Sequence, residues 1–442
     1  MNMKILLFVP PISTWHRVDD GPTLGIGYVA ALLKKHGNKV DIFDLVARPI
    51  RLEAIPKMIN TQTYQIIGIT SFSYNYNCTS KIADLAKQDN PNALVVVGGS
   101  HVTFRPQQTL QNSQSIDIVV MGEGEHTMLE LVSKYEATQD TGCFKEIKGI
   151  CYRDKNGSIR MNPPRPLIKD LDTLPSPYVS KVFDMSMYRT VRLITQRGCP
   201  FRCGFCSNQL FGQSVRTHSL KYIVSDIECC RSIYQKTNFF FEDDILTLNK
   251  KRTIDLCKMI IEQGLDIHFW CQTRADIVDP EILKWLRKAG CISISFALES
   301  ANSRTIGEVI QKTDYPYKWR RAIRRAVSCA KEEGMKVGIS LIIGLPFETK
   351  KMVRRTISFA KSLDCDLTCI NRLLLYPSSR FCENSEQYKL KITGETLLAE
   401  TSELSEEDIN SLMREAFEEL PRNQLSDMMR LSKGTFWQKT LA

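Results

Sequence analysis

Three cysteines stand close together near the middle of this 442-residue chain, where Gly198 to Gln209 reads GCPFRCGFCSNQ. Cys199, Cys203 and Cys206 follow a C-x3-C-x2-C spacing, which places three thiolates on one short loop. Thiolates are soft ligands that suit iron–sulfur clusters or zinc. A structural site of either kind normally takes four protein ligands, and no fourth cysteine follows at a matching short spacing. We therefore expect a cluster with one metal position open for chemistry, and a zinc knuckle is the alternative.

The cysteine loop resembles that of the radical S-adenosylmethionine (SAM) superfamily. In that family the cysteines bind three irons of a 4Fe–4S cluster, and the amino and carboxylate groups of SAM bind the fourth. The reduced cluster then splits SAM into methionine and a 5′-deoxyadenosyl radical. The resemblance implies that Phe205, directly before the third cysteine, lies against the adenine of SAM. It also implies an electron donor such as flavodoxin or ferredoxin.

The composition is that of an ordinary globular protein, with 43% hydrophobic and 24% charged residues. No apolar run approaches the roughly 18 residues of a spanning helix, so we expect no membrane span. The 15 cysteines show no repeated framework and the start reads as a strand rather than a signal peptide, which favours a reducing cytoplasm. The net charge of +10 is dispersed along the chain. We therefore expect a small-molecule substrate and no nucleic-acid partner.

Residues 3 to about 135 alternate short apolar runs of strand length with helical stretches. The expected strands are 5–9, 39–43, 66–70, 94–97 and 116–120, and the clearest helices are 25–36, 80–88 and 127–135. Continuous apolar strands separated by helices predict a parallel sheet covered on both faces, a doubly wound (Rossmann-like) α/β fold. Ligands bind such folds at the carboxyl ends of the strands, so the loops there are the informative ones.

These loops resemble the loops of cobalamin-binding domains. The segment from Ser71 to Ser73 stands where that family has a Ser-x-Leu motif, and Gly98 and Gly99 follow as its glycine pair. The resemblance implies that the glycines let the backbone approach the nucleotide tail of cobalamin, which a side chain would block. The residues that it assigns to cobalamin binding are Ser71, Ser73, Gly98, Gly99, Ser100, Gly122 and Glu123.

One departure from the cobalamin-binding pattern concerns the cobalt ligand. The D-x-H-x-x-G motif that supplies an axial histidine is absent, because Thr14 and Asp19 flank His16 where the motif has Asp and Gly. We therefore expect cobalt without a protein histidine ligand, and His16 as an ordinary loop residue. A domain that keeps the fold but has lost the cofactor is the alternative.

A proline-rich segment at 151–188 predicts a linker, and a second alternation of strands and helices follows it. The expected strands are 191–195, 238–242, 267–271, 293–298, 336–343 and 367–373. Six βα units predict an open, partial TIM-type barrel, with the cysteine loop at the carboxyl end of its first strand. The predicted domains are 1–150 (cobalamin-binding), 151–188 (linker), 189–385 (radical SAM partial barrel) and 386–442 (helical C-terminal region).

Strand ends of the second half supply the expected SAM contacts. By the resemblance, Glu242 and Asp243 contact the amino group of SAM, and a helix N-cap is the alternative. The guanidinium of Arg274 could bind a carboxylate through two hydrogen bonds, and a structural salt bridge is the alternative. Glu299 and Ser340 match positions at the ribose, although relatives often carry an acid where Ser340 stands.

These resemblances cover about residues 3 to 385 and imply a cobalamin-dependent radical SAM enzyme. The implied reaction is methylation of an unactivated carbon or a phosphinate phosphorus, in which a substrate radical takes the methyl group of methylcobalamin. Cyclisation, ring contraction and oxidation remain open, and so does a regulator that binds zinc or a cluster without turnover. A tRNA methylthiotransferase is disfavoured, because Cys78, Cys143 and Cys151 lie too far from the strand-end loops to supply a second cluster.

Overall fold

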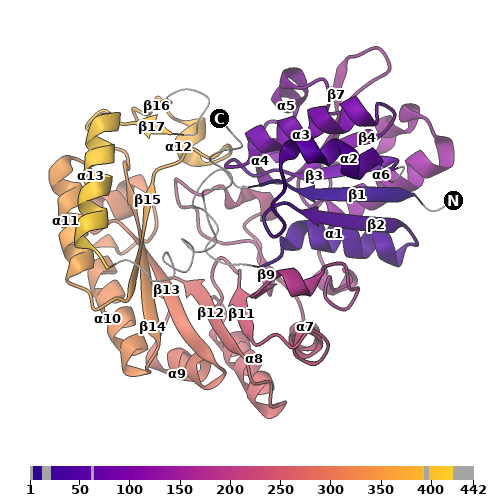
Figure 1. Ribbon diagram of the computed structural model, residues 1–442. Coiled ribbons are helices and arrows are strands. Elements are labelled where there is room, and N and C mark those ends of the chain that lie inside the picture. The colour runs from indigo at the N-terminus through magenta and orange to yellow at the C-terminus, as the bar shows by residue number, and fades with distance from the viewer. Residues whose placement is uncertain (1–2, 12–20, 61–63, 393–397, 422–442) are drawn as a thin grey trace. The chain divides into compact units, whose positions relative to one another are not determined.

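The computed structural model describes residues 3–11, 21–60, 64–392 and 398–421 (Figure 1). The chain divides into two compact units. The first takes in the chain up to Arg192 together with Cys229–Lys236. The second takes in Leu193–Glu228 and the described residues from Thr237 to Pro421. Among the described residues, no helix has the length and apolar character to cross a membrane.

The first unit is built on a seven-stranded sheet with the order β2-β1-β3-β4-β5-β6-β7. The strands are β1 Lys4–Val9, β2 Lys39–Asp44, β3 Ile66–Thr70, β4 Leu94–Gly98, β5 Ile118–Val120, β6 Ile150–Arg153 and β7 Ile159–Met161. Strands β1 to β5 pair in parallel, and β6 and β7 add an antiparallel edge. The parallel core confirms the doubly wound fold predicted from the apolar runs.

Helices cover both faces of this sheet, because alternate strand residues point to opposite sides. Phe8 and Val95 belong to a core shared with α2 and α3, whereas Leu7 and Val96 belong to a core shared with α1 and α6. Figure 1 shows α2 and α3 above β1 and α1 below it. The helices of the unit are α1 Leu24–Lys35, α2 Ile55–Asn60, α3 Tyr76–Asp89, α4 Ser100–Thr103, α5 Pro106–Asn112 and α6 Glu125–Thr138.

The predicted linker at 151–188 needs a correction at its start. Residues 151–161 form most of the β6–β7 hairpin, in which Cys151 pairs with Val119 of β5 and Met161 of β7. The prolines that indicated a linker begin at Pro163, after β7, so they remove no N–H group from the hairpin. Beyond them the chain forms only short 3-10 turns up to β8.

The second unit is built on a six-stranded sheet with the order β15-β14-β13-β12-β11-β8, as the partial barrel requires. The strands are β8 Val191–Leu193, β11 Asn238–Phe241, β12 His268–Thr273, β13 Cys291–Glu299, β14 Lys336–Ile343 and β15 Leu367–Arg372. The connecting helices are α7 Leu220–Ser232, α8 Lys250–Glu262, α9 Pro280–Lys288, α10 Trp319–Glu332 and α11 Lys350–Lys361. Strands β11 to β15 pair in parallel, and Figure 1 shows α8 to α11 along one side of them.

The described part of the C-terminal region is a short β16–β17 hairpin (Lys391–Ile392, Ala399–Glu400) followed by the helix α13 Glu406–Glu419. Ser405 and Asp408 form a capping box at the start of α13. The helix buries Ile409 and Leu412 and packs against α11 and β15. It therefore completes the outer layer of the second unit.

Candidate functional site

The cysteine loop follows β8 and the short strand β9 Gln196–Arg197 in the second unit. All three thiol-bearing residues of the loop are partly exposed. Burial raises the pKa of the Cys199 thiol, and iron binding would favour its thiolate form. The donor set fits a cluster that takes three protein ligands, because three thiols lie on one loop at the carboxyl end of the first strand.

No group of three His, Cys, Asp or Glu residues in the described part of the chain has the geometry to hold a single metal ion. A four-iron cluster does not need such convergence, because each thiolate binds a different iron. The assignment of the cysteine loop as a cluster site therefore depends on its three thiols and on its position at a strand end.

Two distant segments hold the cysteine loop in place. Gly204 donates its N–H to Ile310 O at 2.8 Å and accepts a hydrogen bond from Phe381 N at 2.9 Å. A Cβ atom at Gly204 would lie 2.4 Å from Phe381 Cε1, so only glycine fits here. Arg380 ties the two segments together by donating to Val309 O at 2.9 Å. No pattern in the sequence pointed to this clamp.

Asp243 is buried beneath the start of the cysteine loop. Its Oδ1 accepts hydrogen bonds from Thr195 N at 2.9 Å and Gln196 N at 2.7 Å, whereas its Oδ2 has no partner among the described residues. Burial raises the pKa of Asp243 to about 7, against the opposing effect of these hydrogen bonds. Asn249, and not Asp243, caps the following helix α8. Asp243 therefore links the end of β11 to the strand that enters the loop.

Glu242 and Ser340 lie at different heights of the sheet. Glu242 directly follows β11, is partly exposed, and donates its backbone N–H to Leu193 O at 2.7 Å. Ser340 lies inside β14, opposite Ala297 of β13 and Cys369 of β15, and is also partly exposed. The sheet therefore brings Glu242 to a strand end but leaves Ser340 within its strand.

Arg274 forms the salt bridge that the sequence left as an alternative to a SAM contact. Its guanidinium donates to both carboxylate oxygens of Asp276, at 3.0 and 2.7 Å, and to Lys312 O at 2.6 Å. The same group lies 3.6 Å from the ring centroid of Phe201 in the cysteine loop. Arg274 is thus part of the support of the loop, and binding a SAM carboxylate would require it to exchange a partner.

Glu299 forms a buried ion pair that the sequence analysis missed. Lys312 Nζ lies 3.0 Å from Glu299 Oε1, and the two side chains are only 4% and 7% exposed. Glu299 follows a register shift in β13 and has a φ of 60°, an uncommon conformation for a residue with a side chain. Lys312 Nζ also lies 5.9 Å from the ring centroid of Phe205. A buried carboxylate needs a counter-charge, and this requirement alone could have indicated from the sequence that a basic residue such as Lys312 lies beside Glu299.

A second buried acid joins the ends of β13 and β14. Glu348 Oε1 accepts hydrogen bonds from Ser300 Oγ at 2.6 Å and Asn302 Nδ2 at 3.0 Å. Burial raises the pKa of Glu348. The neighbouring Thr349 caps α11, so the turn after β14 both fixes the strand ends and starts a helix.

In the first unit, the two predicted cobalamin loops lie against each other. Ser71 N donates to Gly98 O at 2.7 Å, and Gly99 has a φ of 111° that favours glycine. A Cβ atom at Gly99 would lie 2.3 Å from Ser71 O. The Ser71 hydroxyl is buried and has no hydrogen-bond partner among the described residues. The close contact between the two loops therefore requires glycine at position 99, and the Ser71 hydroxyl remains for a ligand to satisfy. We call residues 71–73 and 98–100 together the cradle.

Further contacts join the glycine pair to the loop after β5. Ser100 begins α4, and Thr103 Oγ1 at the end of that helix donates to Gly99 O at 2.8 Å. Gly122 N donates to Thr103 Oγ1 at 3.1 Å. In contrast, Glu123 is buried, and its Oε2 accepts a hydrogen bond from Ile168 N at 2.7 Å. Glu123 therefore anchors the chain after β7, and its carboxylate is not directed solely at a ligand.

His16 lies outside the described residues, so the structure does not test the prediction that it is an ordinary loop residue. His101 was not among the predicted residues, yet its Nδ1 lies 3.1 Å from Ser73 Oγ. A histidine directly after a glycine pair was visible in the sequence, but its contact with the other loop depends on the fold.

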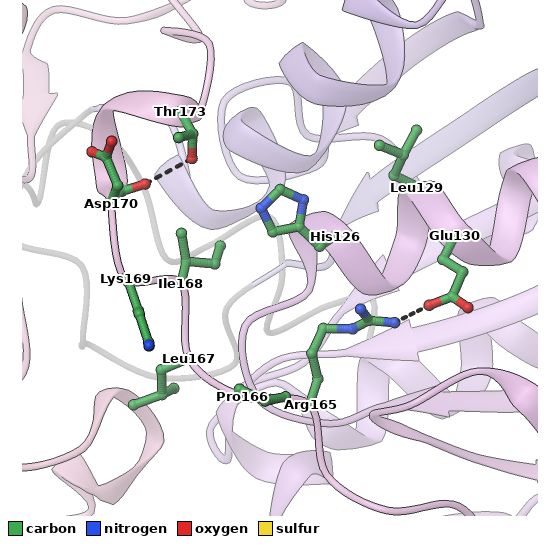
Figure 2. Close-up of a pocket in the computed structure, with 10 residues that line it drawn as sticks. All are labelled: His126, Leu129, Glu130, Arg165, Pro166, Leu167, Ile168, Lys169, Asp170 and Thr173. Atoms are coloured by element: carbon green, nitrogen blue, oxygen red, sulfur yellow. Dashed lines mark hydrogen bonds and ion pairs between the residues drawn. The ribbon is translucent and has the colours of Figure 1, made fainter.

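The first unit also has a hollow of about 570 Å³ beside the start of α6 (Figure 2). Its lining includes none of the predicted site residues and consists of His126, Leu129, Glu130, Arg165, Pro166, Leu167, Ile168, Lys169, Asp170 and Thr173. Figure 2 shows Arg165 turned toward Glu130, with which it forms an ion pair. Arg165 also donates to Thr127 Oγ1 at 2.8 Å. These contacts are satisfied within the protein, and we assign no ligand to the hollow.

Two family models match different parts of the chain. Residues 15–132 match the B12 binding domain, and residues 193–360 match the radical SAM superfamily. The chain is 35% identical over 431 residues to the uncharacterized methyltransferase PH0819 of Pyrococcus horikoshii, covering 94% of this chain and 92% of that protein. It is 29% identical to the anaerobic magnesium-protoporphyrin IX monomethyl ester cyclase of Rubrivivax gelatinosus, over 78% of this chain and 63% of the cyclase.

Among solved structures, the fold resembles the radical SAM methyltransferase TsrM from Kitasatospora setae, which was solved with cobalamin and a [4Fe-4S] cluster bound. The TM-score is 0.72 at 18% identity, and the match covers 87% of this chain and 75% of TsrM. At that identity the likeness concerns the fold alone.

Proposed function

The chain belongs to the radical SAM family whose members carry a B12-binding domain, and on that premise we propose that it methylates an unactivated carbon or a phosphinate phosphorus of a small molecule. The cofactors of this family are cobalamin, a [4Fe–4S] cluster and SAM. When bound, they supply a 5′-deoxyadenosyl radical that removes a substrate hydrogen and a methyl group that replaces it. The observation that carries the proposal is the loop of three partly exposed cysteines at a strand end, with no fourth cysteine in its sequence.

We assign the residues of the second unit as follows. Cys199, Cys203 and Cys206 hold the cluster, and Phe205 lies beside the adenine. Asp243 is suited to the ammonium group of SAM, because its buried Oδ2 has no partner among the described residues. An ammonium group there would supply the missing donor and favour the ionised carboxylate.

Glu299 is suited to the ribose, since its carboxylate accepts hydrogen bonds from hydroxyls and Lys312 holds it in place. Glu242 shares the end of β11 with Asp243, and Ser340 lies within β14 of the same sheet. Arg274 supports the cysteine loop through its contact with the Phe201 ring, and a contact with the carboxylate of SAM is a secondary role.

We assign the cobalamin site to the cradle of the first unit. Gly98, Gly99 and Ser100 are partly exposed, and the buried Ser71 hydroxyl, which has no partner among the described residues, is a donor for an acceptor on the ligand. Ser73 and Gly122 border the same loops, and Glu123 contributes by fixing the segment that follows. Cobalt has no histidine ligand from the chain in this proposal.

The remaining proposals concern organisation and partners. We place the cobalamin domain at 1–150, extended by the β6–β7 hairpin, the barrel at 189–385 and the C-terminal region at 386–442. The electron comes from a flavodoxin or ferredoxin, the substrate is not a nucleic acid, and the enzyme acts in the cytoplasm.

A second candidate function is cyclisation, which the similarity to a monomethyl ester cyclase favours. The two candidates differ in their products from SAM. Methyl transfer yields S-adenosylhomocysteine as well as 5′-deoxyadenosine, whereas cyclisation yields 5′-deoxyadenosine alone.

The test is anaerobic reconstitution with iron, sulfide and hydroxocobalamin, followed by incubation with a reductant and SAM labelled in its methyl group. We expect an absorbing cluster, bound cobalamin, 5′-deoxyadenosine and, from the loading of cobalamin, S-adenosylhomocysteine. Deoxyadenosine without S-adenosylhomocysteine would favour cyclisation, and a protein that binds zinc in place of iron would overturn both candidates.

A further inference from the structure

A buried histidine connects the two loops of the cobalamin cradle. His101 is 9% exposed and lies on α4, directly after the glycine pair. Its backbone N–H donates to Ser71 O at 3.3 Å, and its Nδ1 lies 3.1 Å from Ser73 Oγ. His101 thus contacts the 71–73 loop at both ends of the segment that the sequence analysis assigned to cobalamin.

The ring of His101 is also held by an aromatic neighbour. It stacks on Tyr76 of α3, with ring centroids 4.3 Å apart and planes inclined by 30°. A hydrogen-bond partner offsets the cost of burying a polar ring, and Ser73 Oγ is the partner of Nδ1. The stack and the hydrogen bond together define one orientation of the ring.

His101 is neutral under ordinary conditions. Burial and, as a smaller cause, the charge of nearby Arg105 together lower the pKa of His101 to about 4. A neutral imidazole carries one N–H donor and one acceptor nitrogen, so it binds the Ser73 hydroxyl without adding charge to the cradle.

We propose that His101 is a positioning residue of the cobalamin site, which holds the Ser73 hydroxyl and the 71–73 loop against the glycine pair so that the residues assigned to the nucleotide tail are preorganised. The proposal rests on the proposed function, because it presumes that cobalamin enters this cradle. Preformation matters because a loop that must be ordered by its ligand binds that ligand more weakly.

The test compares variants of the full reconstituted protein by titration with hydroxocobalamin and by the absorption spectrum of the bound cofactor. His101→Phe keeps a ring to stack on Tyr76 but removes Nδ1, and His101→Asn restores a polar atom near the position of Nδ1. His126→Phe, on α6 and outside the cradle, is the matched control. Loss of one buried hydrogen bond corresponds to about tenfold weaker binding.

We expect His101→Phe to bind hydroxocobalamin about tenfold more weakly than the wild type and to shift the cofactor spectrum toward that of free cobalamin. His101→Asn recovers most of the affinity, and His126→Phe binds as the wild type does. If His101→Phe does not fold, Ser73→Ala removes the same hydrogen bond from the other side and should reproduce the loss.

Two failures are distinguishable. A wild-type protein that binds no hydroxocobalamin would overturn the proposed function, and with it this inference. A wild-type protein that binds hydroxocobalamin, with His101→Phe and Ser73→Ala equal to it in affinity and spectrum, would overturn this inference alone.

Discussion

The two candidate sites use opposite kinds of chemistry. The cradle of the first unit consists of glycines, hydroxyls and a neutral histidine, and its one acid, Glu123, anchors a neighbouring segment. The site of the second unit has buried charges, with Glu299 paired to Lys312 and Arg274 to Asp276. The difference matches the proposed ligands, because the tail of cobalamin requires a shaped slot and SAM is a small zwitterionic cation.

This contrast predicts different ways for the two sites to fail. A neutral slot is sensitive to added volume, since a new side chain fills the space of the ligand. A charged site is sensitive to the loss of one partner, since the remaining buried charge is left uncompensated. Because the sites belong to separate compact units, damage to one should leave cofactor binding at the other intact.

The largest expected effect is that of Cys203→Ala. Removal of one of the three thiolates should abolish cleavage of SAM and the cluster absorption, while hydroxocobalamin still binds. The measurements are 5′-deoxyadenosine formation and the two absorption spectra. Cys143→Ala, a partly exposed cysteine of the first unit, is the control and should keep both cofactors. Retention of a SAM-responsive cluster by Cys203→Ala would contradict the assignment of the ligands.

Lys312→Met should produce the next largest effect. It leaves the Glu299 carboxylate buried without its counter-ion, which costs about 3–5 kcal/mol of folding free energy. Urea unfolding measures that loss, and isothermal titration measures the accompanying loss of SAM affinity. The double variant with Glu299→Gln should recover much of the stability but not the affinity.

A matched control for Lys312→Met is Arg304→Met, which removes an exposed ion pair with Glu308. Exposed pairs of this kind contribute at most about 1 kcal/mol. Equal losses of stability from the two variants would show that the Glu299 pair behaves as a surface contact.

Gly99→Ala tests the neutral slot by adding volume. The new Cβ would lie 2.3 Å from Ser71 O at a φ of 111°, so we expect about 1–3 kcal/mol of destabilisation and loss of hydroxocobalamin binding. Gly25→Ala is the control, because a Cβ there meets no atom within 4 Å. Undiminished cobalamin binding by Gly99→Ala would place the tail elsewhere.

The smallest expected effect concerns pH and Asp243. The pKa of Asp243 is raised to about 7 in the folded protein, so between about pH 4 and pH 7 the folded state binds more protons than the unfolded state. The stability that this group contributes is therefore lost as the pH rises toward 7, by no more than about 1.4 kcal/mol per pH unit. Asp243→Asn should remove that slope.

Urea midpoints of the wild type and Asp243→Asn at pH 5.5 and pH 7.5 check this prediction. The variant should gain stability relative to the wild type at the higher pH. An equal difference at the two pH values would mean that Asp243 is ionised throughout.

The sequence predicted the elements that place these sites but not the partners that support them. The cysteine spacing, the apolar strands and the glycine pair are local signals, and the structure confirms the folds they indicate. Lys312 is 13 residues from Glu299, and Arg380 is 71 residues from Val309, so those contacts depend on how the chain packs. The β6–β7 hairpin was missed because nearby prolines obscured its two short strands.

Asp243 and Glu123 illustrate a further limit. Residue type and position suggested that both acids contact cofactors, and the structure shows that both also bind backbone N–H groups of other segments. An acid next to a glycine or a strand end is equally suited to either role. Only the positions of the surrounding backbone N–H groups distinguish an acid that binds a cofactor from one that anchors the backbone.

The most direct test of the account is the electron paramagnetic resonance spectrum of the reduced, reconstituted protein with and without SAM. We expect a paramagnetic 4Fe–4S cluster whose g values change when SAM is added, because SAM would bind the iron that no cysteine holds. A cluster spectrum that does not change when SAM is added, or a protein that contains zinc and no iron, would contradict the proposal that SAM binds an iron without a cysteine ligand.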